Sequence, residues 1–187
     1  MARARRTAGR SQTYVALLRA INLGSRNKIA MQDLRVLFER LGAEDVQTYV
    51  QSGNVVFRSS GNGGALQKSV EEEIANELGL TITVLVRTKT QIAKLARDNP
   101  FGEDAPDKAL HVTFLVDAPA RARVRALDAS AFAPDTFEVA GREVYLNMPN
   151  GYGRSKLSNA YFEKQLGVAA TTRNWKTVTA LAELAGA

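Results

Sequence analysis

The order of strand-like and helix-like segments constrains this fold more than any other feature, because nearly the same order occurs twice. Short runs of β-branched and aromatic residues predict strands, and apolar residues three and four apart predict helices. In the first half these patterns predict strands at 13–19, 46–51, 54–58 and 81–87 and helices at 31–41 and 65–78. The resulting order, β-α-β-β-α-β, is that of the split βαβ or ferredoxin-like fold.

The second half follows nearly the same order after a linking helix at 91–98. Its predicted strands lie at 110–116, 137–140, 143–147 and 169–173, and its predicted helices at 119–129, 155–166 and 175–185. The repeat lies in the order of the elements and not in matching residues. We therefore expect an α+β fold with two ferredoxin-like (split βαβ) halves, antiparallel sheets and a C-terminal helix.

The charge distribution separates a short N-terminal tail from the rest of the chain. The net charge is +6, and the four arginines before residue 13 leave +2 on the remainder of the 187 residues. A basic segment that is poor in apolar residues cannot bury enough surface to become ordered, so we expect 1–12 to be a disordered basic tail. The other expected units are a first ferredoxin-like domain at 13–88, a linking helix and loop at 89–108, and a second domain with its C-terminal helix at 109–187.

Two residue counts exclude several kinds of site. The chain has no cysteine and a single histidine, His111, which excludes disulfides, thiolate nucleophiles, cysteine–zinc sites and any site that needs two histidines. We expect no metal site, and the sequence indicates no particular cofactor.

No apolar run approaches the roughly 20 residues that span a bilayer, and the arginine-rich start lacks the apolar stretch of a secretory signal. We expect a cytoplasmic protein without a membrane partner.

Amide, hydroxyl and cationic side chains gather in loops that the predicted topology brings together. In a split βαβ half, the loop after strand one and the turn between strands two and three lie at the same end of the sheet. The predicted ligand-binding residues at this end are Arg19, Asn22, Asn27, Lys28, Gln51 and Asn54. Such donors, with no carboxylate in their own segments, suit a small anion or a polar head group. A tight two-residue hairpin at Ser52-Gly53, with the amides satisfying loop backbone, is the structural alternative.

The conspicuous loop of the second half, 151–156, lies at the opposite end of its sheet, where we expect it to approach His111. A serine at its end is expected to cap the following helix, and free N–H groups with two cations would form a phosphate or carboxylate site. The predicted ligand-binding residues here are Arg154, Ser155, Lys156, Asn159 and Arg173. His111 is the best candidate for proton transfer. The structural alternatives are an ordinary helix entry, a histidine on the sheet face, and an Arg173 that bonds nearby carbonyls beside a core Trp175.

Five short strings together resemble a known bacterial family. They are ALLRAINLGSRNK, YVQSGNVVF, LHVTFL, GRSKLSN and TTRNWKTV, and they look like the family catalogued as domain of unknown function 1697. The resemblance runs from about residue 14 to residue 184 and implies two ferredoxin-like halves, with no established activity to transfer. One feature departs from a typical helix start. Ala30 stands where Ser, Thr or Asp would cap the helix at 31–41, so we expect that start to be weakly fixed.

Three functions remain open on the sequence alone. The donor-rich loops favour binding or conversion of a small anionic molecule that bears a phosphate or a carboxylate. An RNA-binding sheet needs about three aromatic residues on its central strands, whereas 54–57 and 143–146 hold one each, so only weak contacts of the arginine tail with nucleic acid are expected. The third hypothesis is a protein-interaction module, because each ferredoxin-like sheet leaves one face uncovered, and such faces can pack on each other or form a homodimer.

Overall fold

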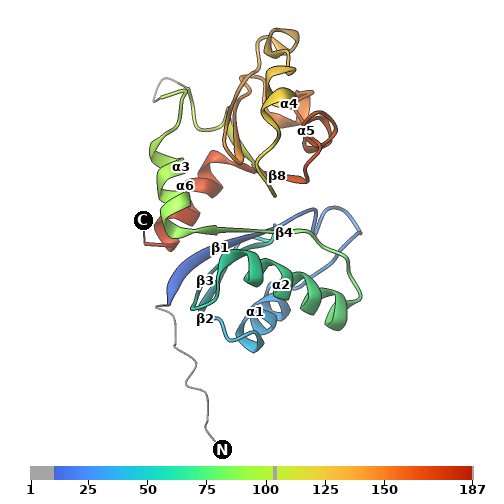
Figure 1. The fold of residues 1–187 in the computed structure, drawn as a ribbon, viewed down its shortest axis with the longest axis vertical. Helices are drawn as coiled ribbons and strands as arrows, with labels where there is room; N and C mark the ends of the chain where they lie inside the picture. Colours follow the sequence, from blue (N-terminus) through green and yellow to red (C-terminus); the bar gives the residue numbers. More distant parts are fainter. Residues whose placement is uncertain (1–10, 103–104, 187) are drawn as a thin grey trace, which may run out of the picture.

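The computed structural model describes residues 11–102 and 105–186, which form two α+β halves with helices between them (Figure 1). The first half contains β1 (Gln12–Leu18), α1 (Met31–Arg40), β2 (Glu44–Tyr49), β3 (Asn54–Ser59), α2 (Gly63–Leu78) and β4 (Val84–Thr88). Its strands form an antiparallel sheet in the order β2-β3-β1-β4. Residues 1–10 of the expected tail lie outside the described part of the chain.

The second half repeats this sheet after α3 (Lys89–Arg97). It contains β5 (Leu110–Leu115), α4 (Arg121–Arg125), β6 (Thr136–Ala140), β7 (Glu143–Asn147), α5 (Asn159–Leu166), β8 (Ala170–Asn174) and α6 (Trp175–Leu184), with short 3₁₀ helices η1 (Ala129–Phe132) and η2 (Tyr152–Arg154). The strand order β6-β7-β5-β8 corresponds to that of the first sheet, strand for strand, and all pairs are antiparallel. The predicted α+β fold of two split βαβ halves with a C-terminal helix is confirmed.

The two sheets also share their register, which makes positions in the two halves equivalent. Arg87 and Arg173 are each the next-to-last residue of the last strand of their half. Asn54 and Glu143 are each the first residue of the third strand, and each pairs with the next-to-last residue of the first strand. The internal repeat therefore extends from the order of the elements to single positions, although the residue types differ.

Three apolar cores hold the molecule together, and the middle core joins the halves. Helices α1 and α2 cover one face of the first sheet, and α5 covers one face of the second. Helices α3 and α6 lie side by side between the halves (Figure 1). The middle core combines the other faces of both sheets with these two helices; it includes Val15, Leu17, Val56, Leu85, Ile92, Leu95, Val112, Phe114, Trp175, Val178 and Leu181. The open sheet faces are thus buried within the chain.

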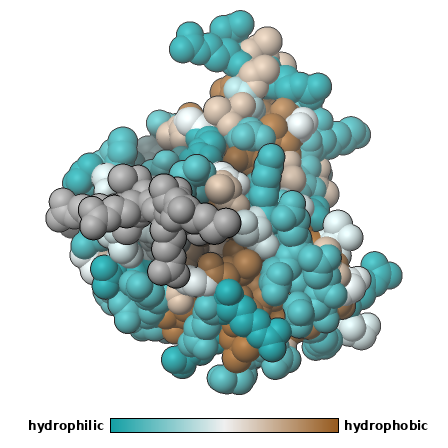
Figure 2. All heavy atoms as spheres, turned by 60° about the horizontal axis from the view of Figure 1, so that its bottom comes forward, coloured by the Kyte–Doolittle hydropathy of each residue, from teal (hydrophilic) through white to brown (hydrophobic). Residues whose placement is uncertain are grey.

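Large apolar side chains are rare on the outside of the described chain. The exposed ones are Leu23, Val50 and Leu184, with relative exposures of 66%, 53% and 37%. On the face drawn in Figure 2, hydrophilic residues surround a smaller hydrophobic area. Within the described residues, none of the helices has both the length and the apolarity needed to cross a membrane.

The turn between β2 and β3 is longer than predicted. Tyr49 pairs with Asn54, so the turn has four residues, 50–53, instead of the predicted two. It is closed by the Asn54 amide, which donates to the Tyr49 carbonyl at 3.1 Å. Gly53 has φ +73°, and a Cβ there would come within 2.7 Å of the Ile21 side chain. This turn therefore needs glycine both for its backbone conformation and for its close approach to the loop after β1.

Two further predictions about helices are wrong and one is confirmed. The helix expected at 119–129 is limited to Arg121–Arg125, followed by η1, because this segment has no fully buried side chain with which to pack. Ser158, not Ser155, caps α5 by accepting a hydrogen bond from the Tyr161 N–H at 3.3 Å. Ser155 lies in the loop before the helix, where its hydroxyl accepts from the Leu157 N–H at 3.0 Å. Ala30 makes no side-chain cap at the start of α1, as expected.

Candidate functional site

The most distinctive polar group of the molecule is the guanidinium of Arg173, a residue that is 8% exposed. Its Nε donates to the Asn54 side-chain oxygen at 2.6 Å. Its two terminal nitrogens donate, at 2.8–3.0 Å, to the Thr171 hydroxyl and to the carbonyl oxygens of Thr172, Leu18 and Ser52. All five N–H donors of an arginine are thereby used. Since Asn54, Leu18 and Ser52 belong to the first half, Arg173 ties β8 to the end of the first sheet.

All N–H donors of Arg173 have acceptors, but its positive charge has no carboxylate partner among the described residues. Among residues 11–102 and 105–186, no carboxylate lies within salt-bridge distance of it. Burial lowers the pKa of the guanidinium to about 10, so the group still carries its proton at neutral pH. A buried cation held by neutral dipoles alone costs free energy that a nearby anion can offset.

Arg173 lies in a cleft of about 320 Å³ between the two halves. The first half supplies Leu18, Arg19, Ala20, Ile21, Leu23 and Ser52, and the second supplies Tyr152, Asn159, Thr171, Thr172, Arg173, Asn174 and Thr177. Of the predicted ligand-binding residues, Arg19 of the first half and Asn159 and Arg173 of the second half line this cleft. From the sequence we expected one site in each half and did not expect residues of both halves to line one cleft.

Arg19 has a carboxylate partner that the sequence did not reveal. Its Nε and Nη2 donate to the two carboxylate oxygens of Glu163 at 2.8 and 2.9 Å. Glu163 comes from α5, and it also accepts from the Ala170 N–H at the start of β8 at 2.8 Å. The charge of Arg19 is thus compensated, and among the arginines that line the cleft the uncompensated charge belongs to Arg173.

The other predicted residues of the first half mainly hold their own loop. The Asn22 amide donates to the carbonyl oxygens of Ile29 and Gln51, both at 2.9 Å, which brings the loop after β1 against the β2–β3 turn. Asn27 donates to the Ala20 carbonyl at 3.1 Å. Asn22 and Asn27 have positive φ angles of 54° and 48°, a backbone region that asparagine tolerates better than most residues. The predicted residues Asn22, Asn27, Lys28, Gln51 and Asn54 are not among the residues that line the cleft.

A short chain of hydrogen bonds holds the side-chain amide of Asn159, which lines the cleft. The Thr172 hydroxyl donates to the Asn159 side-chain oxygen at 2.6 Å, and it lies 2.7 Å from the Thr113 hydroxyl. Because the Asn159 oxygen is used in this way, its NH₂ group remains as the donor, and within the described residues it has no protein acceptor. Asn159 therefore offers a hydrogen bond to a ligand in the cleft.

His111 lies near the Gly-rich loop but outside the cleft lining. Its ring stacks on Tyr152, with centroids 5.2 Å apart and an interplanar angle of 22°, and Nδ1 lies 3.4 Å from the Ala109 carbonyl oxygen. Burial lowers the pKa of the imidazole, which favours the neutral ring at neutral pH. Among the described residues no serine, threonine or carboxylate makes a hydrogen bond with it, so the geometry gives no specific support to the proton-transfer hypothesis.

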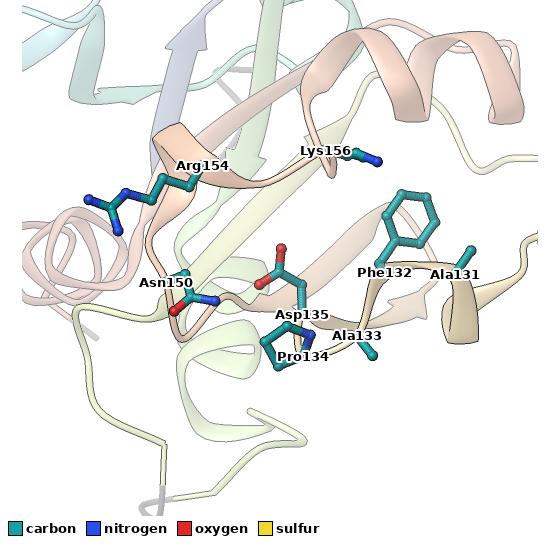
Figure 3. Close-up of a pocket in the computed structure, with 8 residues that line it drawn as sticks. All are labelled: Ala131, Phe132, Ala133, Pro134, Asp135, Asn150, Arg154 and Lys156. Carbon is teal, nitrogen blue, oxygen red and sulfur yellow. The ribbon is translucent and has the colours of Figure 1, made fainter.

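Arg154 and Lys156 line a different hollow of about 460 Å³ (Figure 3). The close-up shows their side chains pointing away from each other, with the Asp135 carboxylate between them. The hollow also contains η1 residues and Pro134. The two cations therefore do not converge on one point, and a carboxylate already contributes negative charge there. No group of His, Asp or Glu in the described part of the chain is arranged to hold a metal ion.

Comparisons with known proteins agree with this architecture. Residues 11–145 match the family described as "Protein of unknown function (DUF1697)". The solved structure of the conserved bacterial protein SP0830 from Streptococcus pneumoniae is similar, with a TM-score of 0.69 and 21% sequence identity, and the match covers 94% of this chain and 99% of that one. At this identity the likeness concerns the fold alone. No curated protein matches the sequence.

Proposed function

We propose that the cleft between the two halves binds a small anionic molecule. The chain belongs to the DUF1697 family. The observation that carries the proposal is the buried guanidinium of Arg173, which lines the cleft without a carboxylate partner among the described residues. An anion in the cleft would lower the cost of burying this charge. Since all donors of Arg173 are occupied, the guanidinium acts through its charge, and other groups make the direct contacts.

The cleft offers donors for those contacts. The free amide nitrogen of Asn159 and the hydroxyl groups of Tyr152 and Thr177 belong to residues of its lining. At about 320 Å³ the cleft is at the lower end of the roughly 300–1,000 Å³ of small-molecule sites. A single-ring carboxylate or a monophosphate fits this volume.

The apolar part of the lining adds a second chemical requirement. Leu23 is largely exposed at the cleft, and Ile21 and Tyr152 line it beside the polar groups. A ligand that places an anionic group toward Arg173 would find apolar contacts at these side chains. We therefore expect benzoate to bind more tightly than acetate, and phenyl phosphate more tightly than inorganic phosphate.

A thermal-shift and calorimetric panel tests the proposal. Acetate, benzoate, inorganic phosphate, phenyl phosphate and nucleoside monophosphates are compared at matched ionic strength, so that general screening is constant. We expect a saturable rise in unfolding temperature with benzoate or phenyl phosphate and a stoichiometry of one per chain. No saturable response to any of these anions contradicts the proposal.

Two variants separate the cleft from the hollow around Arg154. Asn159→Asp replaces the free amide of the cleft with a carboxylate and should abolish the response. The double change Arg154→Ala and Lys156→Ala should leave the response unchanged if the cleft is the site. The opposite result, loss in the double variant and retention in Asn159→Asp, would assign the anion to the Gly-rich loop, as the sequence alone suggested.

The interaction hypothesis has less support than the anion hypothesis. The apolar sheet faces that motivated it are buried against α3 and α6 within the chain. Large exposed apolar residues of the described chain are few. Nucleic-acid contacts of the arginine tail remain a separate prediction, because residues 1–10 lie outside the described part of the chain.

A further inference from the structure

The two halves of the molecule exchange arginines in a reciprocal way. Arg87, in the last strand of the first half, donates from Nη2 to the carbonyl of Leu115 at the end of β5 at 2.6 Å. Arg173, in the last strand of the second half, donates from Nη2 to the carbonyl of Leu18 at the end of β1 at 2.9 Å. Nη1 of each arginine also bonds the carbonyl of the residue before it, at 3.2 and 2.9 Å. These two arginines therefore occupy equivalent positions and share these two kinds of contact.

The partner of the Nε atom differs in charge between the two arginines. The Nε of Arg87 donates to the carboxylate of Glu143 at 2.8 Å, whereas the Nε of Arg173 donates to the amide oxygen of Asn54 at 2.6 Å. Glu143 and Asn54 are the equivalent first residues of β7 and β3. Arg173 makes five hydrogen bonds and Arg87 makes four. Within the described residues, only Arg87 of the two has a counter-charge. Arg87 with Glu143 can therefore serve as a comparison for Arg173 with Asn54, because the two pairs differ in the charge of the partner.

We infer that Asn54 is the residue that determines the specificity of the cleft for an anion, because it supplies the oxygen that Arg173 needs without supplying a negative charge. The inference rests on the proposed function and names the residue that makes one of the two equivalent arginines available to a ligand. For Arg87, the carboxylate of Glu143 supplies the negative charge from within the protein. For Arg173, a molecule in the cleft would supply it.

The direct test exchanges amide and carboxylate at the two equivalent positions. Asn54→Asp places a carboxylate on Arg173 with almost no change of shape, and like-charge repulsion should weaken benzoate and phenyl phosphate binding by about tenfold or more. Glu143→Gln makes the same kind of exchange in reverse at the distant Arg87, and it should leave binding at the cleft within about twofold of the wild type. Calorimetric titration of the three proteins with the same two anions gives the comparison.

A second variant guards against a folding defect in Asn54→Asp. The Asn54 amide donates to the Tyr49 carbonyl and to the Ser52 hydroxyl, and the carboxylate loses the first of these bonds. Ser52→Asp introduces a carboxylate from the half-buried cleft wall and leaves the Asn54 amide in place. It should weaken anion binding to a similar extent.

A ligand-independent measurement distinguishes failure of the inference from failure of the proposed function. Beside an uncompensated Arg173, the carboxyl group introduced by Asn54→Asp should have a lowered pKa, so its contribution to stability is present above the unfolded-state pKa and is lost on acidification. The unfolding temperature of this variant relative to wild type should therefore improve from about pH 3 to about pH 6.

Binding by the wild type and by the two carboxylate variants decides between the inference and the proposed function. Wild-type binding that persists in both Asn54→Asp and Ser52→Asp overturns the inference and leaves the proposed function standing. Absence of wild-type binding overturns the proposed function. If wild type does not bind, the pH dependence of the unfolding-temperature difference between Asn54→Asp and wild type still tests the charge of Arg173. A flat dependence overturns the assignment of an uncompensated charge, and a rise with pH supports it.

Discussion

At the scale of single residues, two buried arginines differ in whether a carboxylate compensates their charge. Arg87 is 2% exposed and has Glu143 as its ion-pair partner, with the guanidinium carbon 5.9 Å from the centre of the Phe114 ring. Burial nevertheless lowers its pKa, while Glu143 opposes that shift. For Arg173, burial alone lowers the pKa. Both arginines are buried, and their surroundings differ in the carboxylate that pairs with Arg87 alone. Experiments should therefore test the effect of a carboxylate beside each arginine.

His111 gives a pH prediction at the same scale. Burial lowers the pKa of its imidazole in the folded state, so the unfolded chain takes up a proton first on acidification and stability falls as pH drops below the unfolded-state pKa. The variant His111→Gln lacks this titration. We expect its unfolding temperature to fall less steeply than that of wild type between about pH 7 and about pH 5. Equal slopes for the two proteins would show that His111 does not titrate differently on folding.

At the scale of elements, helix starts differ in how well they are capped. Helix α2 has Asn62, whose side chain accepts from the Ala65 N–H at 2.8 Å, and α3 has a full capping box at Thr88. Helix α1 begins after Ala30, which has the extended backbone of an N-cap residue but no capping side chain. Its buried residues Leu34 and Phe38 hold it instead. The stability of α1 therefore depends on packing more than that of its neighbours.

The capping difference predicts opposite effects of two substitutions. Ala30→Ser supplies an acceptor at an exposed position with suitable backbone angles, and it should raise the free energy of unfolding by about 0.5–1 kcal/mol. Asn62→Ala removes an existing cap and should lower it by a similar amount. Urea denaturation of the two variants measures both. Destabilisation by Ala30→Ser would mean that the start of α1 is not an N-cap of the usual kind.

Most elements, but not all, follow from sequence patterns for physical reasons that can be stated. The strands and the helices α1, α2, α3 and α6 have apolar residues that pack on a core, and this packing is what produces the pattern. The segment at 119–129 has helix-forming residues but buries none of them fully, so most of it is not helical. Ser155 and Ser158 are both plausible caps by composition, and local geometry selects Ser158.

The site could be predicted only in part, because it depends on contacts between the halves. Topology within one half brings Asn22 beside Gln51, and the structure agrees. The partners of Arg19 and Arg173 are Glu163 and Asn54, which lie 144 and 119 residues away in sequence. These contacts depend on how the two halves pack together around α3 and α6, and no sequence pattern within one half contains that information. Carbonyl bonding by Arg173 was an expected alternative, and it is what the structure has.

At the scale of the whole molecule, the middle core makes the two halves depend on each other. Leu181 of α6 is fully buried in this core, which also contains Val15 of the first sheet and Val112 of the second. The division into separate domains at 13–88 and 109–187 therefore remains a prediction about folding behaviour. The buried crossing contacts of Arg87 and Arg173 favour a single cooperative unit.

Truncation of Leu181 tests this cooperativity. Leu181→Ala should lower the free energy of unfolding by about 2–5 kcal/mol. If the halves unfold together, amide hydrogen exchange should become faster in β1 and β5 to the same extent. Faster exchange confined to β5 would show that the second half opens on its own.

The central claim is that the charge of Arg173, and not that of Arg87, is available to an anion. The most direct measurement is a titration of the wild-type protein with phenyl phosphate, followed by the ¹⁵N–¹H signals of the two arginine Nε–H groups and of the Asn159 side-chain amide. We expect saturable shifts of the Arg173 and Asn159 signals with one common affinity, while the Arg87 signal stays in place. Equal shifts of both arginines, or no shift of Arg173 at saturating phenyl phosphate, would contradict it.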